Sequence, residues 1–192
     1  MEAFSDGVIA IIITIMVLEL RPPHTDDLAA LRPLIPKFLS YVLSFVYLGI
    51  YWNNHHHMLQ AVRHVGGSIL WANLHLLFWL SLVPFATSWM GESHFAMWPV
   101  FCYGVVLICA AMAYTLLSRA LIARHGLDSL LARAIGNDAK GNLSLALYAA
   151  ALPLSIVDPR IACLIYVAVA VIWLAPDRRI EHVMASQPEN PR

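Results

Sequence analysis

The sequence predicts an all-α membrane protein with six transmembrane helices, and three observations support this fold class. Of its 192 residues, 60% are hydrophobic and 12% are charged, with a mean hydropathy of +0.68, whereas soluble domains are about 25% charged. The apolar residues form long runs, and short breaker segments separate these runs. A chain of this size could not bury so much apolar surface in a soluble core, so it requires lipid around it.

Six apolar runs approach the roughly 20 residues that a helix needs to cross the hydrocarbon. They are Phe4–Leu20, Leu34–Met58, Ser68–Met90, Phe95–Leu117, Leu143–Val157 and Ile161–Ala175. The last two runs are nearly continuous, and residues 146–175 could instead form one broken hairpin. The sequence Asp158-Pro159-Arg160 between them would be costly to leave in lipid, which favours two spans. We therefore expect residues 1–192 to form one six-helix domain, with helix kinks at Pro84 and Pro153.

Lysine and arginine positions predict the orientation of these helices, because cytoplasmic loops carry the excess of both. If the N-terminus lies inside, eight basic residues fall on the cytoplasmic side and four on the other side. The cytoplasmic set is Arg63, Arg119, Arg124, Arg133, Lys140, Arg178, Arg179 and Arg192; the other set is Arg21, Arg32, Lys37 and Arg160. Both termini are therefore predicted to be cytoplasmic.

Charge and motif content exclude several functional classes. Twelve basic residues balance twelve acidic ones without a basic tract, so nucleic acid is not an expected partner. Cys102, Cys109 and Cys163 lie in apolar runs and are interpreted as small buried hydrophobes rather than a disulfide set. We expect no cleavable signal peptide, since no basic region precedes the first apolar run. No motif indicates an enzyme, so no catalytic residue or cofactor site is assigned.

The first apolar run carries two distinct faces. At about 100° per residue, Ile11, Ile15 and Leu18 fall on one stripe, with Thr14 on its flank. Taken alone, this periodicity is equally typical of lipid-facing or packed helix surface, and a mid-helix threonine often bonds its own backbone. The stripe is therefore a candidate functional surface that the residue pattern does not assign.

The opposite side of the same run carries Ser5 and Asp6. An unpaired aspartate in a membrane costs several kcal/mol, so we expect it to find partners on other helices. The polar residues of the next two spans are the candidates: Trp52, Asn53, Asn54, His55, His56, His57, Asn73 and His75. We predict a structural polar network of Phe4, Ser5, Asp6, Trp52, His56 and Asn73. Ser5 and Asp6 could also cap the helix entry.

The three adjacent histidines are weak evidence for a metal or haem site. Consecutive helix residues point about 100° apart, so His55, His56 and His57 cannot all face one ion. We therefore expect no metal site, although a histidine-based metal or haem membrane protein stays as a remote alternative.

The first helix resembles that of a known channel family. Phe4-Ser5-Asp6-Gly7, followed by Ile11, Thr14 and Leu18-Glu19-Leu20, closely resembles the signature helix of the bacterial relatives of the endolysosomal potassium channel, the transmembrane protein 175 family. The six-span plan, the tryptophan and histidines of the second span, and the third span from Asn73 to Pro84 are similar as well. The family usually has an arginine just before the motif, where this chain has Met1-Glu2-Ala3.

The resemblance implies a potassium-permeable channel in a prokaryotic plasma membrane, formed by a homotetramer whose first helices line a central pore. Ile11, Ile15 and Leu18 would form stacked apolar rings, with Ile11 the narrowest and Thr14 offering hydroxyls to the ion. The chain has no Thr-Val-Gly-Tyr-Gly loop, so these rings would replace a carbonyl filter. Potassium ions, lipid and the other subunits are the expected partners. The alternative is a proton pathway that uses Asp6 and the histidines.

Overall fold

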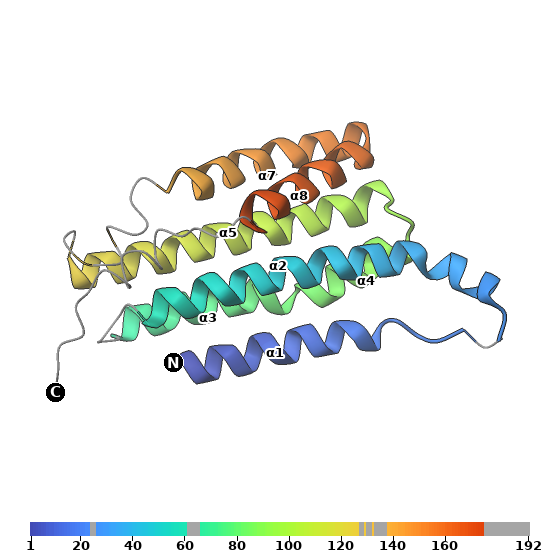
Figure 1. Cartoon of the computed structure of the whole chain (residues 1–192). Helices are drawn as coiled ribbons and strands as arrows, with labels where there is room; N and C mark the ends of the chain where they lie inside the picture. Colours follow the sequence, from blue (N-terminus) through green and yellow to red (C-terminus); the bar gives the residue numbers. More distant parts are fainter. Residues whose placement is uncertain (24–25, 61–65, 127–128, 130–131, 133–137, 175–192) are drawn as a thin grey trace.

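The computed structural model is a bundle of long helices that run roughly side by side (Figure 1). It describes residues 1–23, 26–60, 66–126, 129, 132 and 138–174. Its elements are α1 (Glu2–Leu18), η1 (Leu28–Leu34), α2 (Ile35–Gln60), α3 (Gly67–Ser81), α4 (Val83–Glu92), α5 (Met97–His125), α7 (Ala139–Val157) and α8 (Pro159–Leu174). The helical prediction is confirmed, and the described residues contain no strand.

Four helical stretches in the described part of the chain are long and apolar enough to cross a membrane. They are Leu28–Gln60, Gly67–Glu92, Met97–His125 and Ala139–Val157. The first and last predicted spans correspond to shorter helices, α1 with 17 residues and α8 with 16. The chain is thus a multi-pass membrane protein.

Local chemistry explains where the helices end and break. α3 stops at Ser81 and α4 starts at Val83, with Pro84 in the first turn of α4, where a missing backbone N–H costs nothing. α7 instead continues through Pro153. α7 and α8 are separate helices, because Asp158 ends the first and its Oδ1 accepts the backbone N–H of Arg160 at 2.9 Å. Residues 146–174 are therefore broken into two helices at the predicted position.

The order of the helices across the bundle places α1 at one edge. Figure 1 shows α1 along the lower edge, α2 with α3 and α4 beside it, then α5, and α7 and α8 at the upper edge. α1 packs on α2, α3 and α4, whereas α7 packs on α5 and α8. Successive segments alternate in direction, so the start of α1, the end of α2 and the end of α5 lie at one end of the bundle (Figure 1).

Tyrosines fill the interior between α2, α5, α7 and α8. Tyr47, Tyr103, Tyr148 and Tyr166 are all buried. The Tyr47 hydroxyl donates to the backbone oxygen of Tyr166 at 2.6 Å, and the Tyr166 hydroxyl donates to that of Val100 at 3.2 Å. Hydroxyls buried in a membrane bundle need such internal partners, because lipid supplies none. This tyrosine core fixes α8 and α5 against α2.

Several residues named in the sequence predictions lie outside the described part of the chain: Arg63, Arg133, Arg178, Arg179, Arg192 and Ala175. The three cysteines have free thiols, and each is partly exposed rather than fully buried.

Candidate functional site

One face of α1 packs against the rest of the bundle. Ser5, Ile9, Ile12 and Met16 are all less than 5% exposed. Their spacing of four, three and four residues puts them on one side of a 3.6-residue helix. This face packs against α2, α3 and α4.

The opposite face of α1 is apolar and exposed. The exposed fractions are 58% for Ile11, 45% for Ile15 and 74% for Leu18. Phe4, at 58%, lies at the start of the same surface. The predicted stripe therefore lies on the side of α1 that its own subunit leaves largely uncovered.

Thr14 lies on this exposed face between the isoleucines. Its hydroxyl donates to the backbone oxygen of Ile11 at 2.9 Å, which is the local bond expected of a mid-helix threonine. The hydroxyl proton is thus directed back to the helix, and the oxygen keeps a lone pair that can accept from water or contact a cation.

A buried chain of hydrogen bonds joins α1 to α3 and α2. Asn73 donates from Nδ2 to Ser5 Oγ at 2.9 Å, and its Oδ1 lies 2.7 Å from His55 Nε2. All three side chains are at most 2% exposed. Because Asn73 Oδ1 can only accept, His55 Nε2 carries the proton of this pair. The structure thus pairs Ser5 with Asn73 as predicted, but His55 completes the chain instead of His56.

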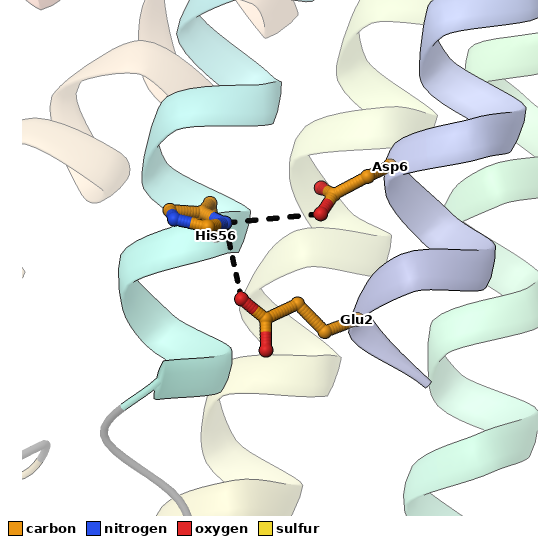
Figure 2. A group of neighbouring side chains, drawn as sticks. All are labelled: Glu2, Asp6 and His56. Carbon is orange, nitrogen blue, oxygen red and sulfur yellow. Dashed lines mark ion pairs between the residues drawn. The ribbon is translucent and has the colours of Figure 1, made fainter.

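A second, half-exposed cluster lies beside this chain at the start of α1. Trp52 Nε1 donates to Asp6 Oδ1 at 3.0 Å. His56 Nδ1 lies 3.8 Å from Asp6 Oδ2 and 3.2 Å from Glu2 Oε1, and both carboxylates reach it from α1 (Figure 2). The rings of Trp52 and His56 stack with their centroids 5.6 Å apart. Phe4, predicted with this network, instead lies on the exposed face.

Glu2 is the member of this cluster that sequence reasoning missed. It precedes Asp6 by four residues, so both carboxylates share one face of α1, and this spacing could have revealed it. The capping interpretation of Ser5 and Asp6 is wrong, because α1 already begins at Glu2 and Met1 is its N-cap residue. One ligand atom each from Glu2, Asp6 and His56 lies within 4.8 Å of the others, so this trio could hold a metal ion.

At its other end α1 contacts α4. Ser88 donates to Glu19 Oε2 at 3.1 Å. Next to this contact an open groove runs between α1 and the α3–α4 pair. Its lining is mostly apolar, and comprises Val8, Ile11, Ile12, Ile15, Glu19, Ser81, Pro84, Phe85 and Ser88. The exposed face of α1 therefore continues into a concave surface of the same subunit.

Known proteins are similar to this chain in sequence. The family model described as endosomal/lysosomal potassium channel TMEM175 matches residues 1–84, which include α1 and the hydrogen-bonded chain. A protein of Chryseobacterium sp. (strain P1-3) named as a potassium channel is 56% identical over 181 residues, 94% of each chain. A Streptomyces collinus protein that is also named as a potassium channel is 34% identical over 124 residues, 59% of each chain. The human endosomal/lysosomal proton channel TMEM175 is 36% identical over 74 residues, 15% of its length.

A solved structure matches most of the fold. The crystal structure of a lysosomal potassium-selective channel TMEM175 homolog from Chamaesiphon minutus superposes with a TM-score of 0.78 at 26% identity, covering 92% of this chain and 95% of that one. Together with the 56% identity to the Chryseobacterium protein over nearly the full length, this match assigns the family. The chain belongs to the TMEM175 potassium channel family, a family of ion channels rather than enzymes.

Proposed function

We propose that the chain is one subunit of a passive potassium-permeable cation channel whose pore is lined by α1. The exposed apolar face of α1 carries this proposal, since Ile11, Ile15 and Leu18 are left 45–74% exposed by their own subunit. The names of the bacterial relatives, potassium channels from Chryseobacterium and Streptomyces, support the choice of ion.

The physical chemistry of such a pore follows from the side chains. Apolar rings narrower than a hydrated ion force it to shed water, and potassium loses water at a lower cost than sodium. The outward oxygen of Thr14 replaces part of the lost hydration. Ile11 forms the narrowest ring in this proposal, and an apolar ring can also close the pore by dewetting. We assign no cofactor to this conduction, and potassium is the proposed permeant ion.

Assembly is part of the proposal, because one helix per subunit cannot enclose a pore and a closed ring of copies can. We assign a homotetramer, a number that comes from the family resemblance. The groove between α1 and the α3–α4 pair offers an apolar surface to a neighbouring copy. Residues 1–192 act as one domain in each subunit.

The topology in this proposal has six spans with both termini in the cytoplasm of a prokaryote. α1 and α8 are about 25 Å long at 1.5 Å per residue, somewhat short of a hydrocarbon core of about 30 Å, and local thinning of the bilayer accommodates such helices. Arg119 and Arg124 at the end of α5, with Lys140 at the start of α7, support a cytoplasmic location for that end of the bundle.

A planar-bilayer recording of the purified protein tests this function. With potassium on one side and sodium on the other, we expect a reversal potential displaced toward potassium. Ile11→Asn should change both conductance and ion preference, because it replaces the proposed apolar ring with amides. Leu164→Asn is the matched control, since Leu164 is 69% exposed on the distant helix α8, and it should change neither. Absence of current from an intact oligomer, or an Ile11→Asn channel identical to the parent, would contradict the proposal.

Proton permeation is a second candidate, favoured by the carboxylate–histidine cluster at the start of α1. The human relative that carries the name proton channel matches a stretch of 74 residues. Liposomes containing a pH-sensitive dye measure this flux directly. A proton pathway through the cluster predicts that Asp6→Asn lowers proton flux more than potassium flux. Equal reductions of both, or none, would count against it.

A further inference from the structure

We propose that Glu2, Asp6 and His56 form a binding site for a divalent transition-metal ion such as Zn²⁺, which bridges the start of α1 to the end of α2 (Figure 2). The site goes beyond the proposed ion conduction, and it does not depend on it. It also departs from the sequence expectation of no metal, because that expectation considered only the adjacent histidines and not the carboxylates of α1.

The distances from His56 to the two carboxylates are close to those around a small ion, and all three ligand atoms lie within 4.8 Å of one another. A tetrahedral zinc ion with ligands at about 2.0–2.1 Å holds them roughly 3.3 Å apart. His56 Nδ1 lies 3.2 Å from Glu2 Oε1 and 3.8 Å from Asp6 Oδ2. Side-chain rotation alone could therefore bring the three atoms onto one ion, and water would occupy the fourth position.

The state of His56 also points to a ligand. Its Nδ1 atom is buried, yet it makes no hydrogen bond with any described residue. The nitrogen faces the space between two carboxylates rather than either one (Figure 2). A hydrogen-bond donor favours alignment with one acceptor, whereas a metal-binding lone pair favours a position shared with other ligands.

Neighbouring side chains supply the outer contacts that metal sites require. Trp52 donates to Asp6 Oδ1, which fixes that carboxylate and leaves Oδ2 for the ion. The side-chain amide nitrogen of Gln60 lies 2.9 Å from His56 Nε2 and donates to it in this orientation. Turning that amide places its oxygen against the Nε2 proton, so that Nδ1 carries the lone pair. A histidine ligand held in this way by an acceptor on its other nitrogen is typical of metal centres.

Charge balance favours a divalent ion over a simple ion pair. Glu2 and Asp6 contribute two negative charges, and a protonated His56 would neutralise only one of them. The basic side chain that the structure places beside both carboxylates is His56. A divalent ion beside neutral His56 balances both charges, and one imidazole with two carboxylates is a donor set that suits zinc.

Metal titration of the purified full-length protein in detergent, after treatment with chelator, tests the site. Co²⁺ serves as the probe, because tetrahedral Co²⁺ absorbs visible light, and calorimetry with Zn²⁺ gives the affinity. We expect one ion per chain. Glu2→Gln and His56→Gln should each lower the affinity at least tenfold and remove the Co²⁺ absorption. His57→Gln, at the adjacent histidine, and Glu92→Gln, at a carboxylate that is outside the cluster, should bind as the parent does.

A thermal melt keeps the result interpretable if a variant is unstable. Zn²⁺ should raise the melting temperature of the parent and of His57→Gln, but not that of Glu2→Gln, whose metal-free melt should match the metal-free parent. No binding by the parent at micromolar metal would overturn the proposal. Binding that persists in both Glu2→Gln and His56→Gln would overturn it as well. Because the readout is binding, the result is independent of potassium current.

Discussion

The tyrosine core and the α1 edge differ in how much of their surface the chain buries and in where their polar contacts lie. In the core, Tyr47 and Tyr166 donate to backbone oxygens of other helices and are almost fully buried. At the edge, α1 buries one face and leaves Ile11 and Leu18 uncovered. Its polar contacts lie mainly at its two ends, through Ser5, Asp6 and Glu19.

The difference indicates which region supplies stability and which serves function. Apolar contact alone gives little net attraction between helices in lipid, so packing and hydrogen bonds must hold them together. The core combines both. α1 is attached mainly along one face, and the other face is left exposed, as the proposed pore requires.

The largest effect on stability is expected where the core packs most tightly. A Cβ atom at Gly104 of α5 would overlap the Tyr166 hydroxyl and crowd Leu152, whereas a Cβ at Gly7 of α1 would meet open space. Gly104→Val should therefore destabilise the fold by about 3 kcal/mol, the upper part of the usual range for overpacking. Gly7→Val should leave the melting temperature in detergent unchanged or slightly higher. Equal melts for the two variants would contradict this contrast.

The buried chain at the α1 edge should give the next largest effect. Asn73→Ala leaves Ser5 Oγ and His55 Nε2 buried without their partner, at a cost of about 2 kcal/mol. A double-mutant cycle with Ser5→Ala checks the assignment through thermal melts. Side chains in direct contact should show a coupling of about 0.5 kcal/mol or more, and strict additivity would mean that Ser5 and Asn73 do not interact.

A smaller effect is expected from the half-exposed cluster. Trp52→Phe keeps an aromatic ring beside His56 but removes the N–H that donates to Asp6. The loss should be about 1 kcal/mol, the usual net value of one hydrogen bond. Trp98→Phe is the matched control, because Trp98 is 58% exposed on α5. If both variants melt alike, the Trp52–Asp6 bond contributes nothing.

The ion pair between Lys37 and Glu92 should contribute least. The atoms are 2.9 Å apart, but the glutamate is 56% exposed, and exposed pairs typically contribute about 0–1 kcal/mol. Lys37→Met should shift the melt by no more than this, and added salt should reduce the difference. A shift as large as that of Asn73→Ala would mean that α2 and α4 depend on this pair.

The sequence predicted the helices well because their signals are local. Apolar runs and breakers located the helices, and Pro84 marked the break between α3 and α4. Helical periodicity placed Ile11, Ile15 and Leu18 on one stripe of α1, but it did not say whether the stripe is packed or exposed. Whether His55 or His56 bonds Asn73 could not be predicted from the sequence, because it depends on how α2 is rotated against α1. The tyrosine core was not predicted either, since its members come from four helices and meet only through tertiary packing.

The central claim is that the exposed face of α1 meets the conduction pathway, and thiol accessibility tests it most directly. The experiment starts from a variant in which Cys102, Cys109 and Cys163 are replaced by serine. Single cysteines are then introduced into this variant at Leu18, Met16 or Leu164. A charged, water-soluble thiol reagent is added while potassium flux through liposomes is measured. We predict that Leu18→Cys is blocked, while Met16→Cys, buried at 2% exposure, and Leu164→Cys, on α8, are unaffected. Flux through Leu18→Cys that persists, or equal block at all three positions, would contradict a pore lined by α1.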